Sequence, residues 1–253
     1  MKRIALITGA SRGLGRALAA AAAAALPELE ELWLVSRNIT VTEELAAACG
    51  GRPLRPICLD LCQPASFAAL REQLQEAEAD IRLLVNNAGC GFLSDVADSP
   101  ARWIAAMTDL NTRALSLVTH LALPHMAAGS HIINVASIAS FCPTPRMTVY
   151  SATKAYVTAF SRGLREELRP RGITVTAVCP GPMDTEFLDI GGIRGNSKTF
   201  STLPYCRPER VARGALRAAL RDRAVYTPQG FYKLYRVLAK LLPQAWVVRI
   251  AAT

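Results

Sequence analysis

The 253-residue sequence has no run of about 18 to 20 solidly apolar residues, so no membrane-spanning helix is expected. Its N-terminus enters a strand-like segment at once, without the pattern of a signal peptide. It also lacks a Pro/Ser/Gly-rich linker, a block of like charges and an internal repeat of roughly 20–50 residues. A single domain over residues 1–253 is therefore predicted.

Paired cysteines are absent too. The seven cysteines are odd in number and scattered, and none forms a CxxC pair. Cys58 and Cys62 have no histidine nearby and would make a poor zinc site, so no metal is expected. Reduced thiols in a cytoplasmic protein are the simplest interpretation.

Acidic residues are scarce near the C-terminus. The formal net charge is +9, and the segment from Tyr205 to Thr253, with ten basic residues against Glu209 and Asp222, accounts for +8 of it. Such a tail could contact phosphates or anionic lipid heads, or could be a solvated helix face. Nucleic-acid binding is not expected, because the basic residues lack interleaved aromatic side chains and a groove-reading motif.

Short apolar segments alternate with helical ones along the whole chain. The expected strands are Lys2–Thr8, Leu32–Ser36, Pro53–Asp60, the start of Ile81–Gly91, His131–Ser137, the start of Gly172–Thr185 and Ala224–Pro228. The expected helices are a closely packed, alanine-rich one from Leu14, Ser66–Asp80, two in Ser99–Met126 that join near Asp109, Thr148–Arg169 and Pro208–Arg221. Asn111 lies at that join, where its amide could distort the helix or hold a water. This β-α-β-α order predicts an α/β fold of Rossmann type, a doubly wound parallel sheet of about seven strands with helices on both faces. Two prolines in Pro53–Asp60 favour a sheet edge.

Tyr150 and Lys154 lie four residues apart in the helical segment Thr148–Arg169, so both side chains share one face of the helix. A fixed cation favours the phenolate, and Lys154 is therefore expected to lower the pKa of Tyr150 toward the working range of an acid or base. Ser137 would orient a substrate oxygen. By itself this spacing also fits a half-buried ring beside a solvated charge.

Gly9, Gly13 and Gly15 form a G-x-x-x-G-x-G turn between the first strand and the alanine-rich helix. Glycines there let the backbone turn tightly and approach a pyrophosphate, whose charge the helix N-terminus favours. The second strand ends at Arg37 with no carboxylate beside it, which suits a 2′-phosphate, and Arg12 could provide a second cation. NADP(H) is therefore expected over NAD(H); the alternative is a surface arginine pair without a ligand.

Further motifs follow these along the chain. In order they are Gly9-x-x-x-Gly13-x-Gly15, Asn86-Asn87-Ala88-Gly89, Asn111, Ser137, Tyr150-x-x-x-Lys154 and Pro180-Gly181. In this order, and close to these spacings, the sequence resembles the classical short-chain dehydrogenases/reductases from about Lys2 to Thr185. The resemblance implies an oxidoreductase that interconverts a ketone and an alcohol.

The resemblance also implies roles for single residues. Tyr150 would protonate a carbonyl or act as the base in reverse, and Lys154 would bond the nicotinamide ribose and depress the tyrosine pKa. Ser137 would hold the substrate oxygen, and Asn111 would hold a water of the proton relay. The implied cofactor contacts are Gly9, Ser11, Arg12, Gly13, Leu14, Gly15, Arg37, Asp60, Leu61, Asn87, Ala88, Gly89, Asn111, Tyr150, Lys154, Pro180, Gly181 and Thr185.

Residues 186–204 stand where this family usually has a mobile substrate lid. Their apolar members, Phe187, Leu188, Ile190 and Ile193, favour a hydrophobic substrate such as a steroid, bile acid or 3-oxoacyl lipid. A basic tail would also suit an anionic substrate. A disordered loop is the alternative for this segment.

Residues 229–253 depart from many family members, which end in a glycine-rich strand used in tetramer packing. Apolar residues recur at helical spacing, and basic residues fall on another face. Three interpretations remain: a helix that closes over the cleft or packs on the body, a contact in a homodimer or other homo-oligomer, or weak contact with a membrane surface. A non-catalytic NADPH-binding sensor and a peripheral membrane protein on the same scaffold are the alternative functions.

Overall fold

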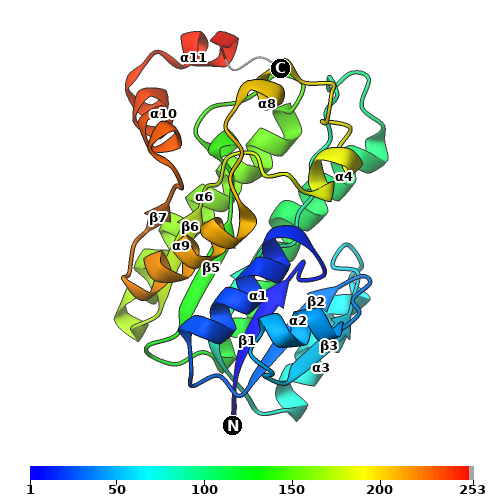
Figure 1. The fold of residues 1–253 in the computed structure, drawn as a ribbon, viewed down its shortest axis with the longest axis vertical. Helices are drawn as coiled ribbons and strands as arrows, with labels where there is room; N and C mark the ends of the chain where they lie inside the picture. Colours follow the sequence, from blue (N-terminus) through cyan, green and yellow to red (C-terminus); the bar gives the residue numbers. More distant parts are fainter. Residues whose placement is uncertain (251–253) are drawn as a thin grey trace.

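A computed structural model describes residues 1–250 of the chain. Its seven strands form one parallel sheet in the order β3-β2-β1-β4-β5-β6-β7 (Figure 1). The strands are β1 Lys2–Thr8, β2 Glu31–Ser36, β3 Leu54–Cys58, β4 Ala79–Asn86, β5 His131–Val135, β6 Thr174–Val178 and β7 Val225–Tyr226. The predicted Rossmann-type sheet is confirmed, and β3 lies at an edge as its prolines predicted.

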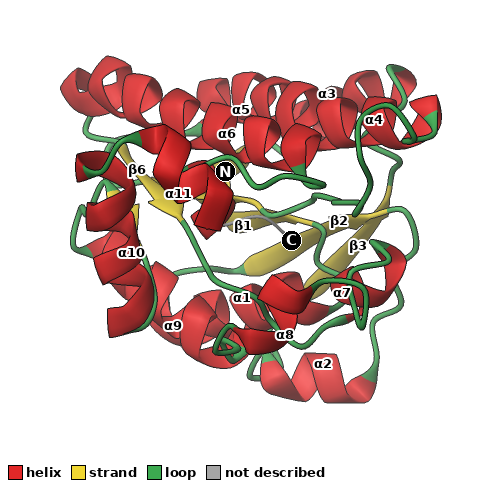
Figure 2. Ribbon diagram, turned by 90° about the horizontal axis from the view of Figure 1, so that it is seen from above, coloured by secondary structure: helices red, strands yellow, loops and turns green. Residues whose placement is uncertain are grey.

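Helices cover both faces of the sheet, as Figure 2 shows from above. On one side lie α1 Gly13–Ala25, α2 Glu43–Ala48 and α9 Pro208–Leu220. On the other side lie α3 Ala65–Glu76, α4 Ala101–Thr108, α5 Leu115–Ala122 and α6 Thr148–Leu168. Strand order reverses between β1 and β4, and ligands of such sheets bind in the crevice at that point.

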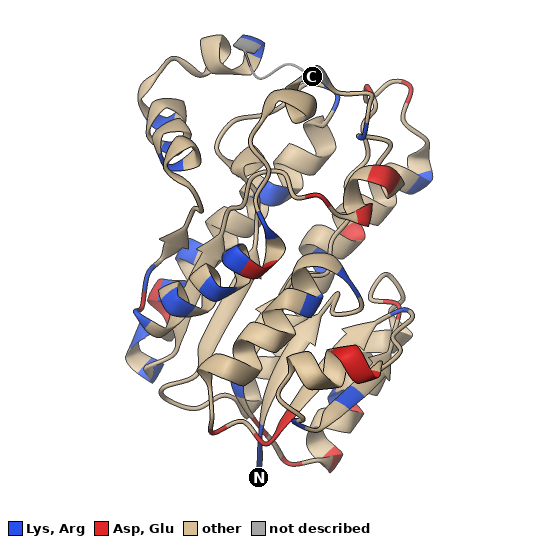
Figure 3. Cartoon of the chain, viewed as in Figure 1, with Lys and Arg blue, Asp and Glu red and all other residues tan. Residues whose placement is uncertain are grey.

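Four further helices gather beyond the carboxyl ends of the strands (Figures 1 and 2). They are α7 Glu186–Ile190, α8 Lys198–Thr202, α10 Gly230–Leu241 and α11 Gln244–Ile250. Basic residues lie along α9 and α10, as expected from the net charge of +8 counted for Tyr205–Thr253 (Figure 3). No helix described within residues 1–250 has the length and hydrophobicity needed to cross a membrane.

The sheet is buried on both faces, and the side chains of β1 alternate between the two cores. Ile4 and Leu6 join the core shared with α3, α5 and α6, whereas Ala5 and Ile7 join the core shared with α1 and α9. Successive side chains of a strand point to opposite faces, so a continuous apolar run is what a covered parallel strand requires. Both cores therefore hold β1 in the centre of the sheet, with its carboxyl end at the crevice.

The alanine run of α1 packs against alanines of α9. Ala19 and Ala22 of α1 are fully buried in the same core as Ala212, Ala215 and Ala219 of α9. Small side chains let two helix backbones approach closely, and alanine also has the highest helix propensity. The closely packed helix predicted for this stretch is confirmed.

Several predicted boundaries differ from the structure. The helix predicted to Asp80 ends at Glu76, because Glu78 takes a left-handed φ of 45° and the chain then enters β4. Strand β5 ends at Val135, because the Ser137 Oγ accepts from the Ala139 N–H and caps a 3₁₀ turn, Ile138–Ser140. The third predicted strand runs only to Cys58.

The predicted junction of two helices near Asp109 is a π-helical turn, Asp109–Ala114, between α4 and α5. Asn111 lies inside it, as the predicted distortion requires. Such π-turns interrupt a helix where a side chain is needed at an unusual angle. This turn aims the amide of Asn111 at the loop that follows β4.

Candidate active site

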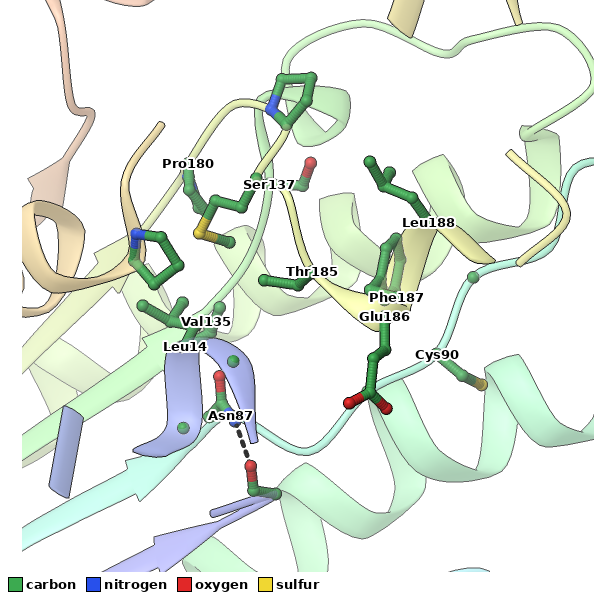
Figure 4. A pocket seen from close by; sticks show the side chains of 18 of the residues that line it. Leu14, Asn87, Cys90, Val135, Ser137, Pro180, Thr185, Glu186, Phe187 and Leu188 are labelled. Carbon is green, nitrogen blue, oxygen red and sulfur yellow. Dashed lines mark hydrogen bonds between the residues drawn. The ribbon is translucent and has the colours of Figure 1, made fainter. Parts of the chain in front are cut away.

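A cavity of about 1330 Å³ runs along the carboxyl edge of the sheet. Every residue that the sequence predicted for the site lines it, except Asn111, which is buried just behind. Figure 4 shows part of its wall, where Ser137 from the end of β5 lies across from Phe187 and Leu188 of α7. The fold thus brings together motifs that are distant in sequence.

The glycine-rich turn forms the floor at the end of β1. Gly9 and Gly13 adopt left-handed φ values of 66° and 52°, which favour glycine. The Asn87 side-chain amide donates to the carbonyls of Thr8 (3.1 Å) and Gly9 (3.0 Å). The Thr8 hydroxyl in turn accepts from the backbone N–H of Asn87 at 3.0 Å, a partner that sequence reasoning missed. These bonds fix the turn to the end of β4.

Helix α1 begins at this turn without a side-chain cap. Its N-cap residue, Arg12, makes no capping hydrogen bond, and its first turn contains no acidic residue. The first backbone N–H groups of a helix need an acceptor, and the helix dipole favours a negative one. The open helix start and the glycine turn therefore fit the pyrophosphate of a dinucleotide.

Three arginines near the glycine-rich turn and after β2 in the sequence line the cavity. Arg37 is exposed and lines the cavity, and no salt-bridge partner for it lies within residues 1–250. Arg16 also lines the cavity, and it pairs with Glu44 at 2.7 Å. Arg12 forms an ion pair with Glu186, the first residue of α7. The structure therefore ties Arg12 to the predicted lid segment, and Arg37 is left as the cation without a carboxylate.

The wall beyond β3 is held in place by its own hydrogen bonds. The Asp60 carboxylate accepts from the Cys62 N–H at 3.0 Å, and the Asp60 carbonyl accepts from the Ser66 hydroxyl at 2.7 Å. Leu61 is buried beside them. This loop and the Ala88–Gly89 segment after β4 both line the cavity.

Tyr150 and Lys154 lie one turn apart at the start of α6, and both are buried against the cavity. The Lys154 ammonium donates to the Val135 carbonyl at 2.8 Å and lies 5.8 Å from the centre of the Tyr150 ring. Ser137 lies close enough to the Tyr150 hydroxyl to influence its pKa. The Val135 carbonyl has no sequence signal, because main-chain acceptors are available at every position.

The pKa of Tyr150 departs from the sequence prediction. Burial raises the pKa of Tyr150 to about 12, although the interaction with Ser137 lowers it in part. Burial lowers the pKa of Lys154 to about 8. Removing each group from water penalises its charged form, and in the chain by itself this effect outweighs the attraction of phenolate to ammonium. The predicted depression of the tyrosine pKa by Lys154 is therefore wrong for the protein alone.

Stability should respond to pH through Lys154. Between about pH 8 and 10.5 the unfolded chain binds a proton that folded Lys154 has lost, so this group raises the free energy of unfolding as pH rises. Denaturant unfolding of the wild type and of Lys154→Met should diverge across this window by about 3 kcal/mol in favour of the wild type. A constant difference would show that Lys154 keeps its charge in the folded state.

Asn111 clamps the loop that follows β4. Its Oδ1 accepts from the Cys90 N–H at 2.9 Å, and its Nδ2 donates to the Cys90 carbonyl at 2.8 Å and to the Thr153 hydroxyl at 3.0 Å. A Cβ added to Gly89 would lie 2.9 Å from that Oδ1 and 3.3 Å from the Lys154 Nζ. Sequence reasoning missed Cys90, because its part in the clamp is made by its backbone.

The predicted lid packs its apolar side chains onto Tyr150. The Phe187 and Tyr150 rings lie 5.7 Å apart between centroids, and a Cβ on Gly91 would come within 3 Å of both rings. Leu188 and Ile193 are buried in the same cluster. The segment contains two short helices, α7 and α8, rather than the disordered loop that was the alternative.

The tail reaches the site through Tyr232, which sequence reasoning missed. This residue of α10 is fully buried, and its hydroxyl donates to the Pro204 carbonyl at 2.6 Å. A Cβ on Gly181 would lie 2.3 Å from its ring, so glycine makes room for the tail. Tyr235, Leu238 and Val247 also line the cavity. The last three residues of the predicted tail, 251–253, lie outside the described residues.

Comparison with known proteins agrees with this geometry. The profile of the short chain dehydrogenase family matches residues 3–190. Sulfoacetaldehyde reductase 2 of Chromohalobacter salexigens is 37% identical over 193 residues, which cover 74% of this chain and 75% of that protein. Estradiol 17-beta-dehydrogenase 11 of Rattus norvegicus is 29% identical over 251 residues, 96% of this chain and 81% of that one.

Solved structures match over almost the whole chain. A short-chain dehydrogenase from Sphingobium yanoikuyae in complex with NADPH has a TM-score of 0.78 and 30% identity, and the match covers 97% of this chain and 98% of that one. A short chain dehydrogenase from Burkholderia cenocepacia in complex with NADP has a TM-score of 0.73 and 28% identity, covering 92% and 98%. The chain belongs to the classical short-chain dehydrogenase/reductase family and is an NAD(P)-dependent oxidoreductase acting on CH–OH groups.

Proposed function

We propose that this enzyme prefers NADPH and interconverts a ketone and a secondary alcohol on a hydrophobic substrate. One observation carries the proposal. Tyr150, Ser137 and Lys154 converge in a single cavity, between the glycine-rich turn and the apolar lid cluster. Proton-transfer groups, a dinucleotide turn and an apolar wall in one space suit hydride transfer to or from a hydrophobic carbonyl carbon.

NADPH, when bound along the glycine turn, would supply the hydride. In the direction of reduction, the Tyr150 hydroxyl donates its proton to the substrate oxygen, and the Ser137 hydroxyl donates a hydrogen bond to the same oxygen. In oxidation the Tyr150 oxygen accepts the proton instead. Because burial raises the pKa of Tyr150 to about 12, its hydroxyl is protonated at neutral pH and is ready to act as the acid.

Lys154 and Asn111 have supporting roles in this proposal. The Lys154 ammonium is fixed by the Val135 carbonyl and would hold the nicotinamide ribose. With the charge beside the Tyr150 ring, it favours the phenolate that follows proton donation. Asn111 holds the Cys90 backbone and would hold the water that continues the proton relay.

The preference for NADPH rests on Arg37. A guanidinium without a carboxylate partner, at the cavity end next to β2, suits the doubly charged 2′-phosphate of NADP(H). Ser11 and Ser36, whose hydroxyls are 3.1 Å apart, offer further donors beside it. Two structural relatives carry NADPH or NADP in their own complexes, which supports the same choice.

The substrate class rests on the apolar residues that line the cavity. They include Phe187 and Leu188 of the lid and Leu238 and Val247 of the tail. One relative is named for an anionic aldehyde and another, which aligns through the tail, for the steroid estradiol. An apolar wall recognises a hydrophobic body far better than a small anion, so a steroid, bile acid or 3-oxoacyl lipid is favoured.

The test is a fluorescence titration of the protein with NADPH and NADH, repeated in Arg37→Ala. NADPH should bind about tenfold more tightly than NADH, and the gap should close in the variant, because only NADPH carries the 2′-phosphate. Arg213→Ala, an exposed arginine on α9 outside the cavity, should leave both affinities unchanged. Equal affinities of the wild type for the two cofactors would refute the role of Arg37.

A further inference from the structure

An exposed apolar strip covers the outer side of the C-terminal helices. Its large side chains are between 40% and 74% exposed. They are Phe231, Leu234, Val237, Leu238, Leu241, Leu242 and Trp246, which we call the tail strip. Single exposed apolar residues are ordinary, but seven within sixteen positions form a contiguous patch that marks an interaction surface.

The strip points outward because the other side of the helices is anchored. Tyr232 and Ala239 of α10 and Val247 of α11 are buried against the body. Residues 232 and 239 are two turns apart on one face of α10, and Leu234 and Leu241, the most exposed members of this helix, lie on the opposite face. The docked helix therefore cannot turn its apolar face inward without losing the Tyr232 contact.

Basic residues flank the strip. Lys233 and Lys240 are exposed on one side of α10, and Arg236 lies between them on the same side. Arg249 is exposed on α11. The last acidic residue of the sequence is Asp222, so nothing after it offsets these charges, and Figure 3 shows α10 with basic residues alone. A large apolar face, a cationic flank and an exposed tryptophan are the features of helices that lie in a membrane interface.

We propose that the tail strip docks the enzyme on the surface of an anionic lipid bilayer, with α10 lying in the interface. The positive charge of the tail argues against a second copy of the chain as the partner that covers the tail strip. A two-fold contact would place the lysines of two tails against each other, with no Asp or Glu side chain in residues 229–253 to pair with them. Anionic lipid headgroups supply the missing negative charge, and acyl chains supply the apolar partner.

The strip is continuous with the cavity. Phe231, Leu238 and Leu242 belong to the strip and also line the cavity wall. A bilayer bound to the strip would therefore face one side of the cavity mouth, where a hydrophobic substrate could enter from the lipid. This last consequence rests on the proposed substrate class, whereas the docking itself does not.

Sedimentation with vesicles tests the docking. The full-length protein should sediment with phosphatidylglycerol-containing vesicles and much less with pure phosphatidylcholine vesicles. Leu234→Glu/Leu241→Glu should weaken the binding roughly a hundredfold, because two side chains no longer enter the interface. Lys233→Gln/Lys240→Gln should weaken it about twentyfold on anionic vesicles. Both positions of each pair are exposed, so NADPH binding and thermal unfolding should stay as in the wild type.

A matched control separates a specific site from general stickiness. Val96→Glu/Leu220→Glu also removes two exposed apolar side chains, 50% and 42% exposed, but away from the strip. It should leave vesicle binding unchanged. Equal loss in this variant, or no sedimentation of the wild type with anionic vesicles, overturns the proposal. So does a wild-type dimer that dissociates in Leu234→Glu/Leu241→Glu without any vesicle binding.

Tryptophan fluorescence gives a second readout that does not depend on activity. Trp33 is fully buried and Trp103 is stacked on Phe92 at 4.7 Å, whereas Trp246 is 63% exposed on the strip. Brominated lipids in anionic vesicles should quench the wild type, and the quenching should disappear in Trp246→Phe. Quenching that persists in the variant would place the membrane contact elsewhere and overturn the assignment of the docking to the tail strip.

Discussion

Replacing Tyr150 by phenylalanine is expected to lower kcat about a thousandfold while NADPH binding stays within about twofold of the wild type. Phenylalanine keeps the ring that packs between Gly91 and Phe187, so the lid cluster and the fold should be preserved. Only the hydroxyl beside Ser137 is lost. The variant should therefore lose the proposed proton donor and keep the binding site.

A matched control lies on the same helix. The Tyr156 hydroxyl meets the Ser116 hydroxyl at 2.8 Å and does not line the cavity. Tyr156→Phe removes the same atom from a neighbouring turn of α6 and should leave kcat unchanged. Steady-state kinetics with NADPH and a hydrophobic ketone, beside an NADPH titration, would measure both variants. Unchanged turnover in Tyr150→Phe would refute the mechanism, and turnover by the wild type excludes the sensor function.

Gly15→Ala is expected to cost about 3 kcal/mol of the free energy of unfolding and to abolish NADPH binding. Its Cβ would lie 2.0 Å from the Gly9 carbonyl oxygen and 2.6 Å from the Asn87 Nδ2. Neither partner can withdraw freely, since the two are hydrogen-bonded to each other at 3.0 Å. The turn must therefore open, and the start of α1 should move away from the proposed pyrophosphate site.

Thermal unfolding should show the loss as a Tm lowered by roughly 10 °C. Gly163→Ala is the control, because this glycine also lies in a helix, is exposed, and has nothing within 4 Å of an added Cβ. There alanine should raise stability by up to about 1 kcal/mol through its better helix propensity. A Gly15→Ala protein with the Tm and NADPH affinity of the wild type would show that the turn adapts without cost.

Local patterns were enough to predict most of the architecture. The predicted run Lys2–Thr8 has the same bounds as β1, and the prolines of β3 mark a sheet edge as expected. A distorted helix was predicted at Asn111, and the structure has a π-turn there. Each depends on side chains within a few positions of one another, because strand burial, missing N–H donors and helix distortion act locally. The order of the elements then limits the topology to a right-handed, doubly wound sheet.

Contacts between distant segments were not accessible in this way. The packing of Tyr232 against Gly181, the ion pair of Arg12 with Glu186 and the Asn111 clamp on Cys90 leave no periodic signal in the sequence. In the sequence, Arg12 lies within a glycine turn, and this neighbourhood alone predicts a phosphate ligand. Glu186, which pairs with Arg12 in the structure, is 174 positions away and gives no local signal. Its partner depends on where α7 lies.

The pKa of Tyr150 also depends on both local sequence and contacts between distant segments. The sequence alone determined that a tyrosine and a lysine share one face of a helix, because the i and i+4 spacing fixes that geometry. Only the tertiary structure decided how deeply both are buried, and burial penalises the charged forms. Desolvation depends on all the atoms that surround a group, most of them from other segments, so its size and even the sign of the net shift emerge only from the folded chain.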